Sequence, residues 1–177
     1  MRIGIIGLGR MGANIARRLI RGGHQVAGVD RDAATLAALA EEGVDACSSL
    51  EELAASLAPP RVFWVMLPAG APTESTIEAL IALASPGDTI IDGGNTFYKD
   101  DIRRAKSCAM KNLSYVDVGT SGGVWGLQRG YCMMIGGDAD AVERLDPIFD
   151  TLAPGVGTIS RTKGREGPPG RAERGYI

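Results

Sequence analysis

The stretch Ile3-Gly4-Ile5-Ile6-Gly7-Leu8-Gly9-Arg10-Met11-Gly12 joins a short apolar strand to a glycine-spaced turn and the start of a helix. This pattern is typical of a dinucleotide-binding fingerprint. Gly7 allows the tight turn, Gly9 lets the backbone approach a pyrophosphate, and Gly12 lets the helix pack against the strand. The amides of the first helical turn, at the positive end of the helix dipole, then face the phosphates.

The residues that follow complete a strand, helix, strand unit. The helix ends at Gly22-Gly23 and leads into the apolar run 26–29, which Asp30 closes. This acid lies where the fingerprint expects a carboxylate that binds the adenosine ribose hydroxyls. The neighbouring Arg31 could stack on adenine or reach a 2′-phosphate, whereas Asp30 would repel that phosphate. We therefore expect NAD as the cofactor, with NADP possible, and we expect Asp32 to cap a helix over 33–42.

Length and composition exclude several function classes. The chain has 177 residues, of which 45% are hydrophobic, and this is enough for one core. A formal net charge of −2 and the lack of a long basic cluster argue against nucleic acid as a partner. No apolar stretch approaches the roughly 18 residues that span a bilayer, so we expect no membrane partner and a cytoplasmic location. We interpret Cys47, Cys108 and Cys132 as small buried residues, and we expect no metal site.

Strands and helices alternate along the rest of the chain. We expect further helices at 49–57, 73–84, 100–112 and 139–152, and strands at 62–67, 89–92, 114–118 and 131–135. This alternation predicts the α/β class, with a doubly wound, mostly parallel sheet of the Rossmann type. Ligands of such a sheet bind at the carboxyl ends of its strands, so the loops that follow the strands are the candidate sites.

Three of these loops carry unusual chemistry: Leu67-Pro68-Ala69-Gly70, Asp92-Gly93-Gly94-Asn95 and Gly119-Thr120-Ser121-Gly122-Gly123. The Asn95 amide could donate to a substrate hydroxyl, although Gly-Gly-Asn also forms ordinary turns. The last loop offers two hydroxyls and unobstructed amides suited to a carboxylate or phosphate oxygen. Alternatively, this loop is only a flexible connection between two elements.

Other polar and aromatic residues give weaker signals. We interpret Trp64 as core, Trp125 as either a cover over the site or a packing residue, and His24 as a solvated turn residue. Removing hydride from an alcohol needs a base within hydrogen-bond reach of the hydroxyl, and no His or Lys here is clearly placed for it. We therefore expect no catalytic residue in this chain.

The region 161–177 differs in composition from the rest of the chain. Basic residues, glycines and a proline pair dominate it. We predict a dinucleotide-binding domain over 1–160 and a polar linker without regular structure over 161–177. The alternative is a basic arm that contacts phosphate.

Four segments together resemble the decarboxylating 6-phosphogluconate dehydrogenases. They are Gly7-Leu8-Gly9-Arg10-Met11-Gly12, Met66-Leu67-Pro68-Ala69-Gly70, Asp92-Gly93-Gly94-Asn95-Thr96-Phe97-Tyr98 with Arg103-Arg104, and Gly119-Thr120-Ser121-Gly122-Gly123-Val124-Trp125-Gly126. The resemblance implies that Leu67, Pro68 and Ala69 line the cofactor and that Asn95 touches both nicotinamide and substrate. It also implies that Ser121, Gly122 and Gly123 hold the substrate carboxylate. With the fingerprint, the expected cofactor-binding residues are Gly7, Leu8, Gly9, Arg10, Met11, Gly12, Asp30, Arg31, Leu67, Pro68, Ala69 and Asn95.

The reaction of that family is an oxidative decarboxylation. The hydroxyl-bearing C3 of 6-phosphogluconate gives hydride to the cofactor, the β-keto acid loses carbon dioxide, and the enediol tautomerises to ribulose 5-phosphate. The family carries its catalytic lysine, asparagine and glutamate in a second, helical domain, and this chain stops before that segment. We therefore expect the 177-residue chain to bind dinucleotide without turnover, and the full-length enzyme to be a homo-oligomer. We also expect the faces that meet the helical domain to expose apolar surface and to favour self-association.

Three features depart from the pattern of the long-form enzymes. Val124-Trp125 replaces a pair of glutamates and Pro68 replaces a lysine, which favours the shorter bacterial type. Asp30 replaces the asparagine usual in NADP-dependent members, which supports NAD. The alternatives are another β-hydroxyacid dehydrogenase, an imine reductase, or a non-catalytic dinucleotide-binding module.

Overall fold

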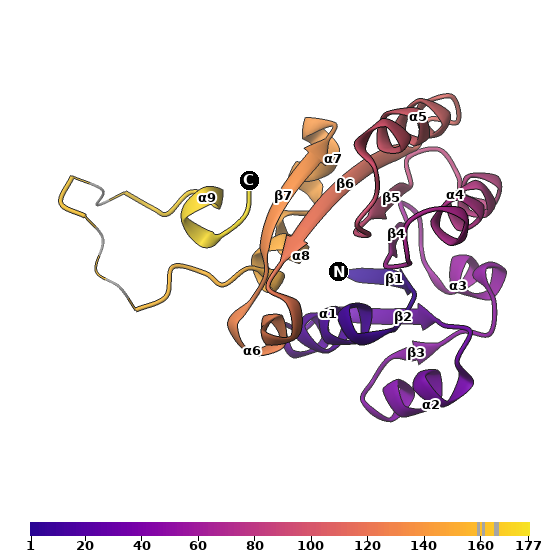
Figure 1. The fold of residues 1–177 in the computed structure, drawn as a ribbon, viewed down its shortest axis with the longest axis horizontal. Coiled ribbons are helices and arrows are strands. Elements are labelled where there is room, and N and C mark those ends of the chain that lie inside the picture. The colour runs from indigo at the N-terminus through magenta and orange to yellow at the C-terminus, as the bar shows by residue number, and fades with distance from the viewer. Residues whose placement is uncertain (159, 161, 165–166) are drawn as a thin grey trace.

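The computed structural model describes residues 1–177 except 159, 161, 165 and 166. Its centre is a seven-stranded sheet in the order β3-β2-β1-β4-β5-β6-β7, with helices on both faces (Figure 1). Every neighbouring pair is parallel except β6 and β7, which are antiparallel. This confirms the predicted α/β fold with a mostly parallel, doubly wound sheet.

The strands are β1 (Arg2–Ile6), β2 (Gln25–Val29), β3 (Asp45–Ala46), β4 (Val62–Val65), β5 (Thr89–Asp92), β6 (Ser114–Ser121) and β7 (Cys132–Gly137). The helices are α1 (Arg10–Arg21), α2 (Ala33–Glu41), α3 (Leu50–Ser56), α4 (Ala71–Leu83), α5 (Tyr98–Ala109), α6 (Gly126–Arg129), α7 (Ala139–Arg144), α8 (Asp146–Leu152) and α9 (Arg171–Arg174). A 3₁₀ turn, η1 (Gly123–Trp125), precedes α6.

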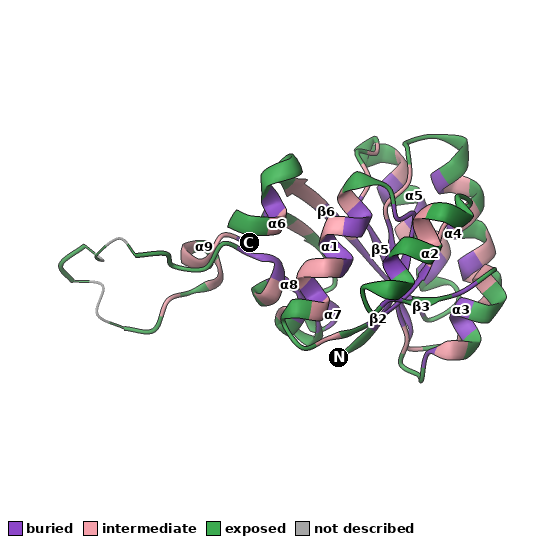
Figure 2. Cartoon of the chain, turned by 90° about the horizontal axis from the view of Figure 1, so that it is seen from below, coloured by how far each residue is buried: buried purple, intermediate pink, exposed green. Residues whose placement is uncertain are grey.

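The sheet separates two apolar clusters, which Figure 2 shows as the buried interior. Alternate residues of β4 point to opposite faces, as strand geometry requires. Trp64 packs with α1 and α8, whereas Phe63 and Val65 pack with α3 and α4. Trp64 is fully buried and meets Phe149 edge to face at 6.2 Å, which confirms that it is a core residue.

Two predicted elements and one burial prediction are wrong in detail. Residues 119–121 are not loop but the end of β6, where Gly119 pairs with Met134 and Ser121 with Cys132. The predicted helix 139–152 is two helices that meet at Leu145, because Pro147 in the first turn of α8 cannot continue a helix. Cys132 is exposed rather than buried, because its side chain lies on the opposite face of β7 from that of the buried Met133, whereas Cys47 and Cys108 are buried as expected.

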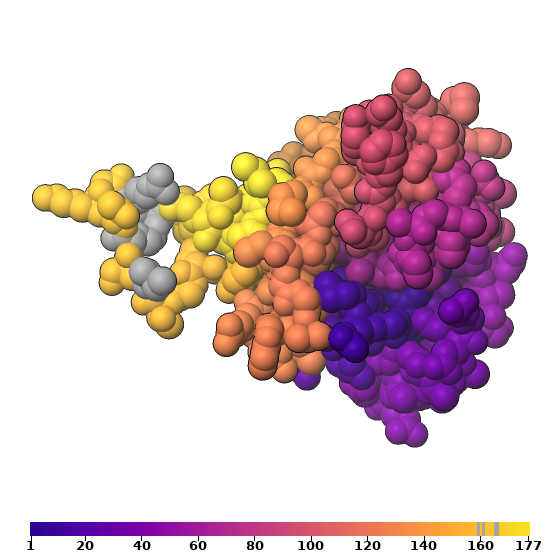
Figure 3. All heavy atoms as spheres, in the orientation of Figure 1, coloured from indigo at the N-terminus to yellow at the C-terminus, as the bar shows by residue number. Residues whose placement is uncertain are grey.

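The segment 171–177 is ordered against the sheet and is not a linker without regular structure. Arg171 forms an ion pair with Asp146 at 2.6 Å, and Arg174 pairs with Asp150. Tyr176 is fully buried, with its ring 6.0 Å from that of Phe149. Figure 3 shows this end of the chain, in yellow, seated against the surface formed by the preceding residues.

Burial of the Tyr176 ring explains the order of this segment, since one large aromatic side chain outweighs the polar composition around it. The part of the linker prediction that rests on Arg161, Arg165 and Glu166 lies outside the described residues.

Candidate functional site

The turn after β1 requires glycine at two positions. Gly7 has a φ of +90°, and a Cβ there would lie 2.6 Å from the carbonyl oxygen of Met66. A Cβ at Gly12 would lie 2.0 Å from the carbonyl oxygen of Gly7, so only glycine lets α1 approach the turn this closely. These contacts give the physical reason for two of the three fingerprint glycines.

Gly9 has a different environment, because no atom of the protein lies within 4 Å of the position of its Cβ. It is the N-cap of α1, with extended backbone, and the first turn of α1 carries no acidic residue and receives no side-chain cap. The first-turn amides, including those of Arg10 and Met11, lie at the positive end of a twelve-residue helix. The absent Gly9 side chain therefore leaves room for an anion at this helix terminus.

Asp30 lies beside this turn. Its Oδ2 accepts a hydrogen bond from the Leu8 N–H at 2.6 Å, and its Oδ1 accepts one from the Asp32 N–H at 2.8 Å. The Leu8 side chain is buried, so Leu8 offers its backbone to the site. Arg31 is exposed next to Asp30. Asp32 caps α2 by accepting from the Ala34 N–H at 3.0 Å, which confirms the predicted cap.

The loop Leu67–Ala69 follows β4 and borders the turn. The Met66 N–H donates to the carbonyl oxygen of Ile6 at 2.8 Å, which holds the end of β4 beside the end of β1. Pro68 and Ala69 are exposed, and the buried Thr73 hydroxyl donates to the Pro68 carbonyl at 2.9 Å. The backbone of this loop is therefore fixed from α4.

The loop after β5 lies against the Leu67 loop. A Cβ on Gly93 would lie 2.1 Å from Trp64 Nε1, and a Cβ on Gly94 would lie 3.0 Å from the Leu67 carbonyl oxygen. Both glycines thus serve close packing, and Asn95 follows them as an exposed residue. The structure brings together the fingerprint turn, the Leu67 loop and the Asn95 loop at one edge of the sheet.

The third predicted loop begins at the end of β6. Ser121, Gly122 and Gly123 are exposed, and both glycines have positive φ, +147° and +49°. Gly123 opens η1, which packs against α1, so this segment lies near the fingerprint helix. Trp125 in η1 is 62% exposed, with the Arg129 guanidinium 5.4 Å from its ring centroid.

His24 lies away from these loops, as expected, but it is half-buried rather than solvated. Its Nε2 lies 2.8 Å from Thr151 Oγ1, and its Nδ1 lies 3.1 Å from the N-terminal amine. Burial, with the nearby N-terminal charge, lowers the pKa of His24.

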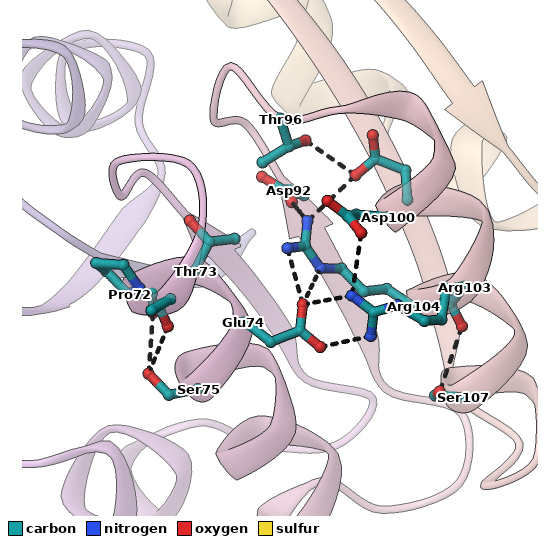
Figure 4. A network of polar contacts seen from close by, with 12 residues as sticks. Pro72, Thr73, Glu74, Ser75, Asp92, Thr96, Asp100, Arg103, Arg104 and Ser107 are labelled. Atoms are coloured by element: carbon teal, nitrogen blue, oxygen red, sulfur yellow. Dashed lines mark hydrogen bonds and ion pairs between the residues drawn. The ribbon is translucent and has the colours of Figure 1, made fainter.

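A buried ionic network beneath the Asn95 loop was missed by the sequence reasoning. Its centre is Arg104, whose side chain is 3% exposed and pairs with Asp92 at 3.1 Å and Glu74 at 2.9 Å (Figure 4). The Tyr115 hydroxyl shares its single proton between Asp92 and Asp101, whose oxygens each lie 3.0 Å away. The available signal was an acid that ends a strand, followed twelve residues later by an arginine.

The charges of this network shift the pKa of several of its members. The guanidinium groups of Arg103 and Arg104 lower the pKa of Glu74 to about 2. Burial raises the pKa of Asp92. Burial and the carboxylates of Asp101 and Asp92 raise the pKa of the neighbouring Asp117 to about 6.

Two kinds of site are absent from the part of the chain that the structure describes. It holds no group of three or more His, Cys, Asp or Glu side chains arranged for a metal ion. None of its helices has the length and apolar character needed to cross a membrane.

The parallel sheet, the glycine turn with its open helix terminus and the acid after β2 define the class: a Rossmann-type dinucleotide-binding domain. The family model described as the NAD binding domain of 6-phosphogluconate dehydrogenase matches residues 2–160. The chain belongs to this family of oxidoreductase domains, which confirms the resemblance in sequence.

Curated relatives and solved structures agree with this assignment. YqeC of Bacillus subtilis is 42% identical over 153 residues, covering 86% of this chain and 51% of the relative. The NAD(+)-dependent, decarboxylating 6-phosphogluconate dehydrogenase of Haloferax volcanii is 37% identical, covering 88% of this chain and 51% of the relative. The chain thus spans about half the length of these relatives.

Two solved structures show the same fold. The 6-phosphogluconate dehydrogenase of Plasmodium falciparum superposes with a TM-score of 0.83 and 29% identity, over 89% of this chain and 35% of that one. The 3-hydroxyisobutyrate dehydrogenase of Mycobacterium tuberculosis superposes with a TM-score of 0.80 and 28% identity, over 86% of this chain and 52% of that one.

Proposed function

We propose that this chain is the cofactor-binding half of a 6-phosphogluconate dehydrogenase that decarboxylates its substrate oxidatively, with NAD as the preferred cofactor. The open space at Gly9, above the uncapped terminus of α1, is the observation that carries the proposal. A pyrophosphate fits there, because it needs close backbone approach and free amides. When bound, the nicotinamide accepts hydride from the substrate.

The remaining residues have assigned parts in this proposal. Asp30 binds the ribose hydroxyls and disfavours a 2′-phosphate, and Arg31 covers the adenine. Leu67, Pro68, Ala69 and Asn95 line the nicotinamide half of the site. Asn95 also donates to the substrate, and the exposed residues Ser121, Gly122 and Gly123 hold the substrate carboxylate.

We assign residues 1–160, together with the packed segment 171–177, to the cofactor domain, and we assign the proton-transfer groups to a second domain of the full-length enzyme. Four large apolar side chains are each more than half exposed: Phe97 directly before α5, Tyr98 and Ile102 in α5, and Met134 in β7. Such a group of apolar side chains supports contact with another domain or subunit. The chain alone is expected to bind dinucleotide and not to convert 6-phosphogluconate.

Calorimetric titration of the chain with NADH and NADPH tests this function. We expect saturable binding of both, with NADH about tenfold tighter because Asp30 repels the extra phosphate. The Gly9→Ala variant should remain folded and bind NADH at least about tenfold more weakly. Folded wild-type chain that gives no binding heat with either cofactor would refute the proposal.

The likeness to 3-hydroxyisobutyrate dehydrogenase favours a second candidate, the oxidation of another β-hydroxyacid at the same kind of site. Assays of the full-length gene product with 6-phosphogluconate and with 3-hydroxyisobutyrate separate the two. Release of carbon dioxide with pentose phosphate formation supports the first candidate, and oxidation of 3-hydroxyisobutyrate alone supports the second.

A further inference from the structure

The Arg104 network joins the two loops assigned to the nicotinamide. Asp92 closes β5 directly before Gly93, and its Oδ1 accepts the N–H of Gly94 at 3.0 Å. Its Oδ2 accepts hydrogen bonds from Arg104 Nη1 at 3.1 Å and from the Tyr115 hydroxyl at 3.0 Å. One carboxylate therefore links the Asn95 loop to the buried guanidinium.

The same guanidinium reaches the other loop through Glu74. Arg104 Nε donates to Glu74 Oε2 at 2.9 Å. Glu74 lies in the first turn of α4, next to Thr73, whose hydroxyl holds the Pro68 carbonyl at 2.9 Å. Figure 4 shows Glu74 and Asp92 on opposite sides of Arg104, each from a different element.

The Asn95 loop is also held on its far side. The Thr96 hydroxyl donates to Asp101 Oδ1 at 2.9 Å, and the same oxygen accepts the Tyr115 hydroxyl at 3.0 Å. Residues on both sides of Asn95 are therefore fixed to one buried network, while Asn95 itself is exposed.

We infer that Arg104, with Asp92 and Glu74, is a positioning residue that sets the distance between the Pro68 and Asn95 loops and thereby shapes the nicotinamide half of the cofactor site. This inference rests on the proposed function. None of the three side chains needs to touch the cofactor, because Asp92 and Arg104 are buried beneath the loops. The adenosine half, built on Gly9 and Asp30, does not depend on the network.

Burial makes this arrangement specific. A guanidinium that is 3% exposed and meets several carboxylates has few alternative geometries, because moving it would leave buried charges unpaired. Lysine cannot replace the planar guanidinium, because its single ammonium group cannot donate to Glu74 and Asp92 from two separate nitrogens. Arg104 therefore links α4 to α5 and to the loops that precede them, alongside the Arg103 ion pair with Glu74.

Binding of NADH and of ADP-ribose to the 177-residue chain separates positioning from general stability. ADP-ribose lacks the nicotinamide and reports only the adenosine and pyrophosphate half. In Glu74→Gln, which keeps shape and loses charge, we expect the Kd for NADH to rise by about three- to tenfold and that for ADP-ribose by less than about twofold. Arg104→Lys should give the same split. Glu78→Gln, an exposed position one turn further along α4, is the matched control and should change neither.

The fluorescence of bound NADH gives a local readout, because it reports the surroundings of the nicotinamide. We expect a smaller change in NADH fluorescence on binding to Glu74→Gln than on binding to the wild type.

An equal loss of affinity for NADH and ADP-ribose in Glu74→Gln, or no change in either affinity, would overturn the inference. Equal affinity of the wild type for NADH and ADP-ribose would overturn it as well, because the two loops would then contribute nothing. Failure of the wild type to bind ADP-ribose would instead refute the proposed function. If Arg104→Lys does not fold, the affinities of Glu74→Gln for NADH and ADP-ribose test the inference without it.

Discussion

The backbone N–H of Leu8 donates a 2.6 Å hydrogen bond to Oδ2 of Asp30. This bond connects the turn after β1 with the end of β2, two segments that lie side by side in the parallel sheet. The carboxylate is therefore fixed beside the opening above Gly9, with a negative charge where the ribose of a dinucleotide would lie.

Replacing Asp30 with asparagine should change the choice of cofactor. The amide keeps an oxygen for the Leu8 N–H but removes the charge that repels a 2′-phosphate. We expect the NADPH to NADH affinity ratio to rise by about tenfold, measured as two dissociation constants by calorimetry. Asp32→Asn removes a nearby charge while keeping a good N-cap, and it should leave the ratio nearly unchanged. An unaltered ratio in Asp30→Asn would contradict the assigned part of this residue.

The turn glycines should separate binding from folding. Gly12→Ala places a Cβ 2.0 Å from the Gly7 carbonyl oxygen and should cost at least about 3 kcal/mol of unfolding free energy. Gly9→Ala meets no protein atom and should stay within about 0.5 kcal/mol of the wild type. Its NADH affinity should nevertheless fall by at least about tenfold, because the methyl group occupies the approach of the pyrophosphate. Urea unfolding and calorimetry of the two variants measure both effects, and full NADH affinity in Gly9→Ala would count against the site.

Asp117 should make stability depend on pH in a defined direction. Its carboxyl faces Tyr98, Asp101 and Tyr115 across a groove of about 260 Å³ between α5 and the ends of β6 and β7. Burial raises its pKa to about 6, above the ordinary 3.8, so the folded state favours the protonated form. The penalty for ionising Asp117 is therefore fully present above pH 6, decreases as the pH falls from 6 towards 3.8, and is lost below that range.

The variant Asp117→Asn should consequently be more stable than the wild type by about 1 kcal/mol at pH 8, after allowance for solvent screening. The difference should vanish near pH 4. Denaturant unfolding at both values checks this, and a stabilisation that is the same at each pH would assign the effect to something other than ionisation.

Tyr176 should contribute strongly to the stability of the domain. Its fully buried ring lies 6.0 Å from that of Phe149, and removing it leaves a cavity at the edge of the core. We expect Tyr176→Ala to cost about 3 kcal/mol in urea unfolding. Ile177→Ala, at a residue that is 73% exposed, should cost less than about 0.5 kcal/mol. Equal stability of the two variants would restore the interpretation of this segment as a linker.

The fold was predictable from sequence because local patterns and the sheet agree. The apolar runs of β1, β4 and β5 alternate with helices at lengths that permit only a parallel arrangement. The glycine spacing located the turn, since Gly7 and Gly12 have backbone requirements that no other residue meets. Because these requirements arise within a short stretch of the chain, they can be recognised from this sequence alone.

The errors have a common physical origin in contacts between distant segments. Gly119 and Ser121 suggest a loop until β7 supplies hydrogen-bonding partners from the antiparallel side. Tyr176 lies in a polar stretch, and its place in the core comes from contacts with Phe149 and Met133, which are distant in sequence. Arg104 was noted only as part of the family resemblance, because nothing in its neighbourhood in sequence predicts that Glu74, thirty residues away, would face it.

The hydrogen bonds of Gly175 and Ile177 with Met133 and Ile135 have a consequence for behaviour at high concentration. β7 is the last strand of the sheet, and an open outer edge presents its amides and carbonyls to any second molecule with a free strand. Here the chain's own residues occupy the backbone groups of Met133 and Ile135. Release of residues 175–177 would expose the edge of β7 as a template for intermolecular β-pairing and aggregation.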